Sequence, residues 1–278
     1  MWILQIIKEN KNIILKNCEC FDISLSLDCG QAFRWRKNEE NIWSGVAKNK
    51  YLKLKQINNE IIFYDTTEED FNLIWKEYFD LERDYNSILN KYDELNLATA
   101  CKKYNGIRIL KQDEWEAICS FIISQNNNIP RIKGIIERLC ENFGERTGES
   151  YSFPAADILA DKTLDDLAVL RAGFRAKYIL DAAKKVSAKE VDIEKIKTMK
   201  FDDAKAELLK IKGVGEKVAQ CSLLYGFGRI EAFPQDVWVK RIVSELYPDG
   251  LPECIKGTEG IAQQYLFHWR RNLDETKQ

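Results

Sequence analysis

The sequence predicts an α+β protein, in which a twisted antiparallel β-sheet is followed by an all-helical domain. Up to about residue 65, apolar and polar residues alternate in short runs without a helix between them, which is typical of neighbouring antiparallel strands. From about residue 67 onward, apolar residues recur at helical spacing. We therefore assign residues 1–100 to a sheet domain, with a helical tail from about residue 67, and residues 101–278 to a helical domain.

Four segments of the first part show the alternation that is expected of a β-strand. They are residues 23–27, 33–35, 51–55 and 60–64.

The helices are predicted from their first residues and from their apolar faces. Thr67 is a candidate N-cap because Asp70 follows it three residues later. Residues 113–124 open with acidic side chains, and Pro130 is compatible with the first turn of the next helix. The other predicted helices are residues 155–160, 163–170, 175–187, 202–210, 216–226, 236–246 and 259–270.

Composition excludes several classes of protein. The 278 residues are 45% hydrophobic and 31% charged, so the chain can form a core and is neither disordered nor collagen-like. The net charge of −2 neither requires nor excludes a polyanionic partner. No stretch reaches the roughly 18 apolar residues of a membrane span, and the N-terminus has no basic leader before its short apolar run. We therefore expect an intracellular protein that does not associate with membranes.

The eight cysteines are scattered and form no paired CxxC units. Cys18 and Cys20 are one residue too close for a zinc knuckle. We expect free and mostly buried thiols, and we assign no metal-ligating residues.

Residues 208–241 carry the strongest functional signal. One helix is expected to end shortly before Gly213, and a second to begin directly after Gly215, which gives a helix–hairpin–helix over residues 202–226. Because the first N–H groups of a helix are unpaired, this turn is a candidate site for a DNA phosphate.

Two side chains near the hairpin have chemical potential. Lys217 lies in the first turn of the second helix, where the helix dipole disfavours a cation and so favours the neutral, nucleophilic amine. Asp236 lies in the loop of residues 233–237 and is a candidate N-cap for the helix that follows.

In these features the sequence resembles the helix–hairpin–helix DNA glycosylases, which have a Gly/Pro-rich hairpin and a downstream Asp. Lys217 is similar to the hairpin lysine of the bifunctional members. Other segments narrow the resemblance to 8-oxoguanine DNA glycosylases of the type first described in eukaryotes. These segments are residues 29–35, 43–46, 126–132, 173–178 and 260–267, and they follow the family's order.

The resemblance implies a reaction and two catalytic residues. The family flips oxidised guanine out of duplex DNA, excises it and then cleaves the strand at the abasic site. Lys217 would attack C1′ of the sugar and form a Schiff base, from which β-elimination follows. Asp236 would stabilise the cationic sugar in the transition state.

The resemblance also implies residues that bind the base. The main-chain carbonyl of Gly30 would accept the N7–H of 8-oxoguanine, a donor that guanine lacks. Gln263 would bind the pairing edge of the flipped base, while Phe267 and Cys221 would cover its two faces.

A further set of residues would contact the DNA. Asn126, Arg131 and Arg175 match positions that fill the gap left by the flipped base and contact the opposite base. Phe174 replaces a wedging Tyr of the eukaryotic enzymes, and Trp238 replaces a His that contacts the phosphate backbone. The residues that we assign to DNA binding are thus Asn126, Arg131, Phe174, Arg175, Gly213, Gly215 and Trp238.

The expected partner is double-stranded DNA that contains 8-oxoguanine, bound by a monomer in the cytoplasm, nucleoid or nucleus. No organic cofactor is implied, although a structural cation on the hairpin carbonyls near Ile211 and Val214 is compatible with the resemblance. Two alternatives stay open: a related glycosylase for another damaged base, and a non-catalytic module that uses the hairpin only to bind phosphate.

Overall fold

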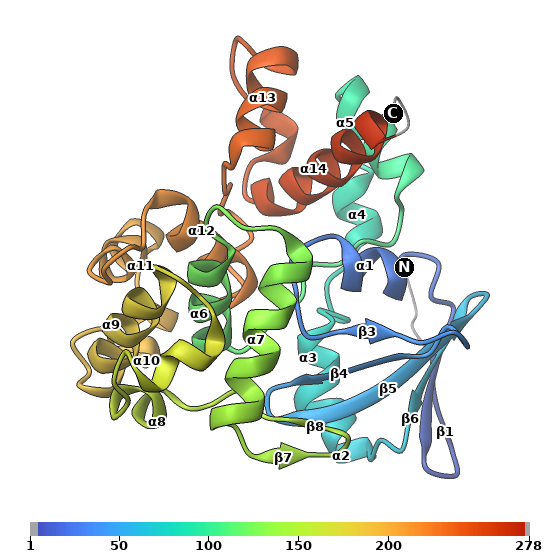
Figure 1. Cartoon of the computed structure of the whole chain (residues 1–278). Helices are drawn as coiled ribbons and strands as arrows, with labels where there is room; N and C mark the ends of the chain where they lie inside the picture. The colour runs from blue at the N-terminus through green and yellow to red at the C-terminus, as the bar shows by residue number, and fades with distance from the viewer. Residues whose placement is uncertain (1–4, 276–278) are drawn as a thin grey trace.

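The structure, a computed structural model, describes residues 5–275 and places an antiparallel sheet beside a group of helices (Figure 1), which confirms the predicted fold class. Six strands pair in the order β1-β2-β6-β5-β4-β3, and every pair is antiparallel. The strands are β1 (Gln5–Glu9), β2 (Asn12–Lys16), β3 (Arg36–Lys37), β4 (Trp43–Ala47), β5 (Lys50–Ile57) and β6 (Glu60–Tyr64). Residues 1–4 lie outside the described residues. The expectation that the chain has no basic leader sequence rests partly on these residues.

The strand predicted at residues 23–27 is wrong, because this segment forms helix α1 (Ile23–Asp28). Asp22 caps the helix, and its Oδ1 accepts the N–H of Leu25 at 2.7 Å. The buried residues are Ile23, Ser26 and Leu27, which have helical spacing. The sequence pattern suggested a strand because the buried residue Ser26 is polar and Leu25 is only half-buried.

Residues 33–35 are also not a strand, although their alternation is real. Phe33 packs among the helices, with its ring centroid 6.0 Å from that of Phe121. Trp35 packs in the core of the sheet, where its Nε1 donates to the hydroxyl of Tyr78 at 2.8 Å. The two faces of this segment therefore contact two different cores.

The predicted helix starts are largely confirmed by side-chain caps. Thr67, Asp113 and Asn128 each accept a backbone N–H at the first turn of their helix. The early helical elements are α2 (Glu68–Asp70), a π-helical turn (Phe71–Trp75), α3 (Lys76–Tyr78), α4 (Tyr85–Leu89), α5 (Leu95–Lys103), α6 (Glu114–Ser124) and α7 (Ile129–Phe143). The later ones are α8 (Ala156–Ala160), α9 (Arg175–Ser187), α10 (Ile193–Thr198), α11 (Phe201–Leu209), α12 (Glu216–Tyr225), α13 (Val237–Leu246) and α14 (Glu259–Glu275), with 3₁₀ turns at Asp166–Leu170 and Glu253–Ile255.

Some features of the helical part differ from the prediction. Residues 163–170 form only the 3₁₀ turn at their end, and α10 was not predicted. A short hairpin, β7 (Arg146–Thr147) and β8 (Ser150–Tyr151), interrupts the helices. These elements are short, so they contain too few residues to show a period.

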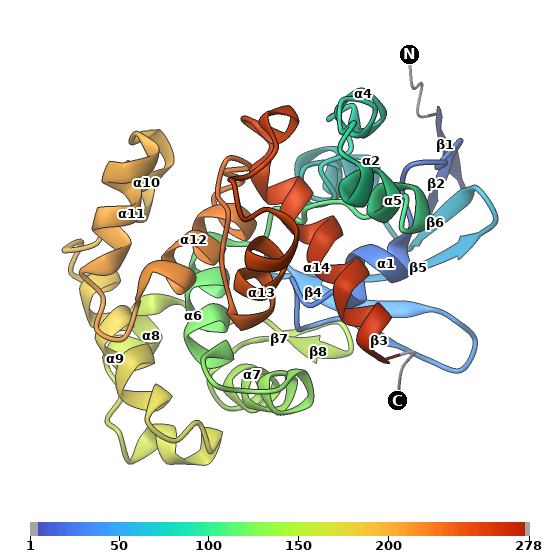
Figure 2. The same cartoon turned by 90° about the horizontal axis from the view of Figure 1, so that it is seen from above.

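Helix α6 lies in the middle of the helices and packs against α7, α9 and α12 (Figure 1). Helix α14 runs from α13 towards α1 and the sheet (Figure 2) and also packs on α5. The C-terminal helix therefore joins the first and last parts of the chain. No helix within residues 5–275 is long and apolar enough to cross a membrane.

A buried ion pair also joins the two parts. Arg34 Nη1 lies 3.2 Å from Glu116 Oε2, and both side chains are less than a tenth exposed. Arg34 also donates to the carbonyl of Tyr151 in β8. Burial raises the pKa of the Glu116 carboxyl to about 7, while the charge of Arg34 lowers it. The pair therefore links the segment after Gly30 to α6 and to the β7–β8 hairpin.

All eight cysteines are free thiols, and seven of them are buried, as the sequence predicts. Burial raises the pKa of the thiols of Cys18, Cys29 and Cys140 to about 12. These three residues are therefore neutral core residues at physiological pH.

We expect Glu116→Leu to lower the free energy of unfolding by about 3–5 kcal/mol, because it leaves the Arg34 charge buried without its partner. The double variant Arg34→Met/Glu116→Leu should recover part of this loss, since it removes both charges. Urea unfolding followed by tryptophan fluorescence measures both values. A double variant that is less stable than either single variant would contradict this interpretation.

Candidate active site

A small pocket of about 60 Å³ lies between α12, α14, the loop before α13 and the loop after α1. It is lined by the two predicted catalytic residues and the four predicted base-binding residues: Lys217, Asp236, Gly30, Cys221, Gln263 and Phe267. These residues come from four separate parts of the chain, so only the fold brings them together.

Lys217 is half-buried in the first turn of α12. Its Nζ donates to the Oγ of Ser124 at 3.3 Å and lies 5.4 Å from the ring centroid of Phe121. The Ser124 hydroxyl in turn donates to the carbonyl of Phe121 at 2.8 Å. The serine therefore presents a lone pair to the amine, which holds the nitrogen at the pocket wall.

Asp236 is the N-cap of α13, as predicted, and its Oδ1 accepts the N–H of Val239 at 2.8 Å. The cap fixes the carboxylate at the edge of the pocket. Pro234, two residues earlier, also lines the pocket and restricts the backbone of this loop. An amine and a carboxylate thus share one cavity.

Gly30 has a backbone φ of +89°, in the left-handed region that favours glycine. A Cβ atom at this position would lie 3.9 Å from the side chains of Ile129 and Phe267, which is ordinary contact. Conformation rather than lack of space therefore selects glycine here.

Gln263 and Phe267 lie four residues apart and so on one face of α14. Gln263 is only 5% exposed, and its Oε1 has no hydrogen-bond partner within residues 5–275. A buried amide oxygen without a partner is costly, which indicates that a ligand donor completes the site.

Cys221 lies one helical turn after Lys217 and is 4% exposed. Burial raises the pKa of its thiol, while the charge of Lys217 lowers it. The thiol is therefore neutral and presents an apolar surface to the pocket.

The two hairpin glycines have different structural roles. Gly213 has a φ of +83°, and a Cβ atom there would lie 2.3 Å from the ring of Tyr178. Gly215 has an extended backbone, and a Cβ atom there would meet nothing within 4 Å. Gly215 is the N-cap of α12 and has no side chain, so it leaves the first N–H groups of α12 without a side-chain cap.

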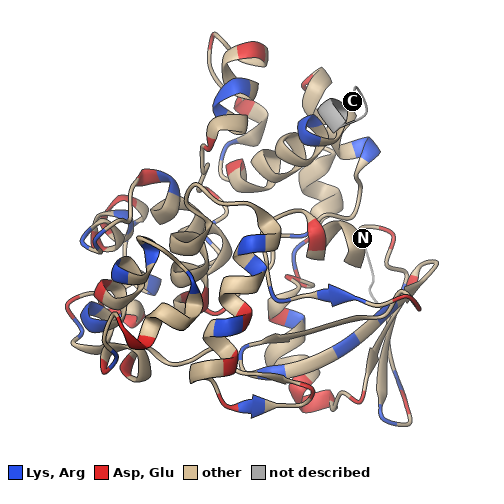
Figure 3. Cartoon of the chain, viewed as in Figure 1, with Lys and Arg blue, Asp and Glu red and all other residues tan. Residues whose placement is uncertain are grey.

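The other predicted DNA-binding residues lie outside the pocket. Phe174 is 45% exposed, and Arg131 is exposed in the first turn of α7. Figure 3 shows both basic and acidic residues along α7, and the two kinds are interspersed over the rest of the fold as well. Trp238 is 39% exposed in the first turn of α13, 5.4 Å from the guanidinium of Arg241.

The structure assigns Arg175 a contact that the sequence did not suggest. Its side chain is buried, and it donates to the carbonyls of Gln125 at 2.8 Å and of Asn126 at 2.7 Å. Its guanidinium also stacks on the ring of Phe174 at 4.4 Å. Arg175 thus holds the turn in which Asn126 has a φ of +45°, and it would have to release these carbonyls to reach a base.

Several pocket residues were missed by the sequence reasoning. They are Cys29, Phe121, Tyr225, Pro234 and Gln264 at the pocket wall, and Ser124 behind Lys217. Cys29 and Gln264 could have been found because each adjoins a predicted site residue. Ser124 and Tyr225 had no such signal, because their proximity depends on the packing of α6 against α12.

A larger hollow of about 250 Å³ lies between the sheet, α7 and the β7–β8 hairpin. Some of its charged groups are paired, as Arg36 is with Glu137 at 3.5 Å and Glu149 is with Lys53 at 2.5 Å. Within the described residues, none of its lining side chains has a buried polar atom without a partner, in contrast to Gln263 of the smaller pocket.

Two family models match adjacent parts of the chain. Residues 13–118 match the N-terminal domain of 8-oxoguanine DNA glycosylase. Residues 119–251 match the HhH-GPD superfamily of base excision DNA repair proteins. The two matched ranges meet inside α6.

The chain is similar to known proteins over most of its length. A protein of Methanothermobacter thermautotrophicus named "Probable N-glycosylase/DNA lyase" is 34% identical over 237 residues, which cover 72% of this chain and 76% of that protein. The structure of MBOgg1 in complex with a low affinity DNA ligand is 39% identical, with a TM-score of 0.91 and coverage of 98% and 99% of the two chains.

A second solved structure has the same overall similarity. It is the crystal structure of Clostridium acetobutylicum 8-oxoguanine glycosylase/lyase in complex with double-stranded DNA containing cytosine opposite to 8-oxoG. It is 36% identical, with a TM-score of 0.91 and coverage of 99% of this chain and 100% of that chain.

We expect the two hairpin glycines to respond differently to alanine. Gly213→Ala should lower the free energy of unfolding by about 2–4 kcal/mol, because it combines backbone strain with a clash against Tyr178. Gly215→Ala should cost about 1 kcal/mol or less, because the added methyl group meets open space. Thermal unfolding of the two variants measures the difference, and equal losses would argue against the hairpin geometry.

Proposed function

The chain belongs to the 8-oxoguanine DNA glycosylase family of base-excision repair enzymes, and we propose that it excises 8-oxoguanine from duplex DNA and then cleaves the strand at the abasic site. The main support for this proposal is that Lys217, Asp236 and Gln263 line one pocket, and that within the described residues the Oε1 atom of Gln263 is buried without a hydrogen-bond partner. An amine and a carboxylate suffice for the reaction, and the amide oxygen is free to bind the base.

The base must leave the helical stack to reach this pocket. We propose that the flipped base lies between Cys221 and Phe267, which contribute apolar surfaces from α12 and α14. The Oε1 of Gln263 accepts a hydrogen bond from the pairing edge of the base, which satisfies this buried atom. The carbonyl of Gly30 accepts the N7–H that distinguishes 8-oxoguanine from guanine.

Lys217 acts as the nucleophile in this proposal. Its neutral amine attacks C1′ of the sugar, and the bond from C1′ to N9 breaks with its electron pair leaving on the base, which takes up a proton. The sugar ring then opens, and the amine and C1′ form a Schiff base. Loss of a proton from C2′ expels the 3′ phosphate, which cuts the strand.

Asp236 stabilises the positive charge that develops on the sugar as the base leaves. One carboxylate oxygen is held by the N–H of Val239, so the group does not have to reorganise during the reaction. The helix cap and the catalytic role are therefore compatible.

DNA would be held by residues around the pocket. The uncapped first turn of α12 after Gly215 presents N–H groups to a phosphate. The exposed ring of Phe174 is available to wedge between bases, and the exposed residues Arg131 and Asn126 would contact the opposite base. Trp238 adds an exposed surface beside Asp236.

We propose that the protein acts as a monomer on DNA inside the cell and uses no organic cofactor. A cation on the hairpin carbonyls would be structural. The carbonyl of Ile211 already accepts the N–H of Val214 at 3.0 Å, and Lys185 donates to the carbonyl of Lys210 at 2.7 Å. The chain itself thus satisfies part of the hairpin.

We expect borohydride to trap the protein covalently on a duplex with 8-oxoguanine opposite cytosine, because borohydride reduces a Schiff base. Lys217→Gln should abolish the trapped species. Lys212→Gln removes an exposed lysine of the same hairpin and serves as the matched control, which should trap like the wild type. Excision without trapping would favour a related monofunctional glycosylase, and binding without either would favour a non-catalytic module.

We expect Asp236→Asn to slow excision about 100-fold, because the amide cannot stabilise the cationic sugar as a carboxylate does. The fold should be retained, since Asn and Asp are equivalent N-caps. Single-turnover excision together with thermal unfolding separates the two effects. An Asp236→Asn variant with wild-type excision would contradict the catalytic role.

A further inference from the structure

The three consecutive carbonyl groups of Cys29, Gly30 and Gln31 differ in their hydrogen bonds. The carbonyl of Cys29 accepts from Nε2 of Gln264 at 3.2 Å. The carbonyl of Gln31 accepts from Nε2 of Gln112 at 2.7 Å. The carbonyl of Gly30, between them, has no hydrogen-bond donor anywhere in residues 5–275. The outer carbonyls are thus satisfied by the protein, and the middle one is left for a ligand.

Both glutamines are held by one residue, Gln264 through its side chain and Gln112 through its backbone N–H. The hydroxyl of Tyr225 donates to Oε1 of Gln264 at 2.6 Å. The main-chain carbonyl of Tyr225 accepts the N–H of Gln112 at 2.7 Å. Gln112 is 4% exposed and Gln264 is 1% exposed, so neither amide exchanges its partners with water. Tyr225 is the last residue of α12, the helix that begins beside Lys217.

The side chain of Gln31 holds the same segment from the other side. Its Nε2 donates to the carbonyls of Ser26 and Arg108, both at 2.8 Å. Its Oε1 accepts the N–H of Leu110 at 2.9 Å. The side chain is fully buried, so its amide is committed to the backbone on both sides.

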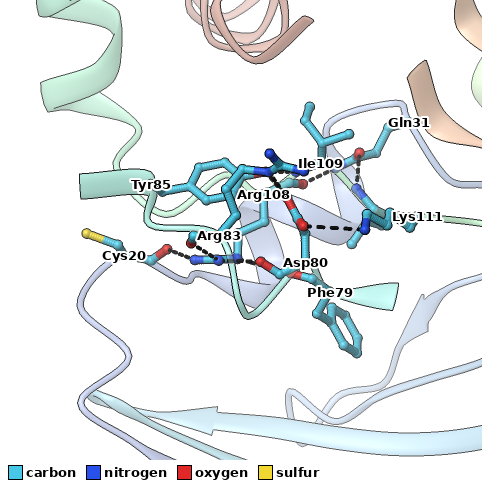
Figure 4. A network of polar contacts seen from close by, with 10 residues as sticks. Cys20, Gln31, Phe79, Asp80, Arg83, Tyr85, Arg108, Ile109 and Lys111 are labelled. Carbon is cyan, nitrogen blue, oxygen red and sulfur yellow. Dashed lines mark hydrogen bonds and ion pairs between the residues drawn. The ribbon is translucent and has the colours of Figure 1, made fainter. Parts of the chain in front are cut away.

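Arg108 connects this arrangement to the sheet domain (Figure 4). Its guanidinium donates to the carbonyls of Phe79 at 3.0 Å and of Cys20 at 3.1 Å, and it lies 4.2 Å from the ring centroid of Tyr85. The segment that Gln31 contacts is therefore fixed to a rigid part of the protein.

We propose that Gln112 and Gln264 are positioning residues that set the discrimination between 8-oxoguanine and guanine. This inference rests on the proposed function, in which the Gly30 carbonyl accepts N7–H. A hydrogen bond weakens steeply with misalignment, and the left-handed backbone of Gly30 has no side chain to restrict the rotation of its peptide groups. Any such rotation would break the buried hydrogen bonds of the flanking carbonyls, so the two glutamines hold the reading group in place.

Gln264→Leu and Gln112→Leu remove the amides while they keep the approximate side-chain volume. We expect excision of 8-oxoguanine to fall about tenfold in each variant, because the Gly30 carbonyl loses its alignment. Cleavage of a preformed abasic site should be unchanged, since that step uses Lys217 and no base. Because Leu also leaves the Tyr225 hydroxyl without an acceptor, the double variant Gln264→Leu/Tyr225→Phe, which removes this hydroxyl as well, is the second variant.

Binding measures the discrimination directly. In the Lys217→Gln background, the ratio of the Kd for a guanine duplex to that for an 8-oxoguanine duplex should fall about tenfold when Gln112 or Gln264 is replaced. Fluorescence anisotropy with the two duplexes, each with cytosine opposite, gives this ratio. A purely structural role would weaken both duplexes equally and would leave the ratio unchanged.

Gln56→Leu is the matched control. This half-buried glutamine donates to the carbonyl of Phe21 at 3.1 Å and accepts the N–H of Ile23 at 2.9 Å, away from the pocket. It should lower stability without changing the ratio of Kd values. An unchanged ratio in the Gln112 and Gln264 variants, or an equal fall of excision and abasic-site cleavage, would overturn the inference. A wild-type protein that cleaves abasic sites but excises no 8-oxoguanine would instead overturn the proposed function.

Discussion

The pocket depends on the hydrogen bonds that hold residues 29–31 against segments far away in the sequence. The carbonyls of Cys29 and Gln31 are bound by Gln264 of α14 and by Gln112. These bonds are buried, so breaking one would leave a polar group unsatisfied rather than expose it to water. The pocket walls come from the loop after α1 and from α6, α12 and α14, so no single part of the chain could form the pocket alone.

Helix α12 connects these hydrogen bonds to the proposed nucleophile. Its first turn carries Lys217, and its last residue, Tyr225, holds both Gln112 and Gln264. The hairpin before the helix is fixed by Gly213, whose backbone lies against Tyr178. One rigid helix therefore sets the distance between the nucleophile and the group proposed to read the base, which favours an active site that is preorganised before DNA binds.

The sequence predicted the structure correctly where a feature depends on neighbouring residues alone. Thr67 and Asp236 cap helices as predicted, because a cap depends only on the next three residues. The resemblance named the six pocket-lining residues to which the proposed reaction assigns a role: Gly30, Lys217, Cys221, Asp236, Gln263 and Phe267. The division at residue 100 stays a prediction, while α4 and α5 pack in the core of the helices and not in that of the sheet.

The sequence failed where burial involves polar residues. Ser26 is buried in α1, and its hydroxyl donates to the carbonyl of Gly106, so a helix resembled an alternating strand. Arg175 matches a base-contacting position of the family, yet it is buried and bonded to the turn at Asn126. In both cases the partner is a main-chain carbonyl brought close by tertiary packing, and no spacing along the chain encodes it.

The residues behind the pocket are buried, whereas the residues proposed to contact the duplex are exposed, and this difference in exposure agrees with their proposed roles. The Gly30 carbonyl, which we propose to recognise the base through one hydrogen bond, has to be fixed before the base arrives. The buried side chains of Gln112 and Gln264 would do this by binding the carbonyls on either side of it. Residues that are proposed to contact a whole duplex can stay exposed and adjust, as Phe174 at 45% and Trp238 at 39% exposure can. Arg175 lies at the boundary, because it stacks on the exposed Phe174 and is itself held by buried carbonyls. It therefore couples the exposed ring of Phe174, which we propose to wedge between bases, to the turn at Asn126.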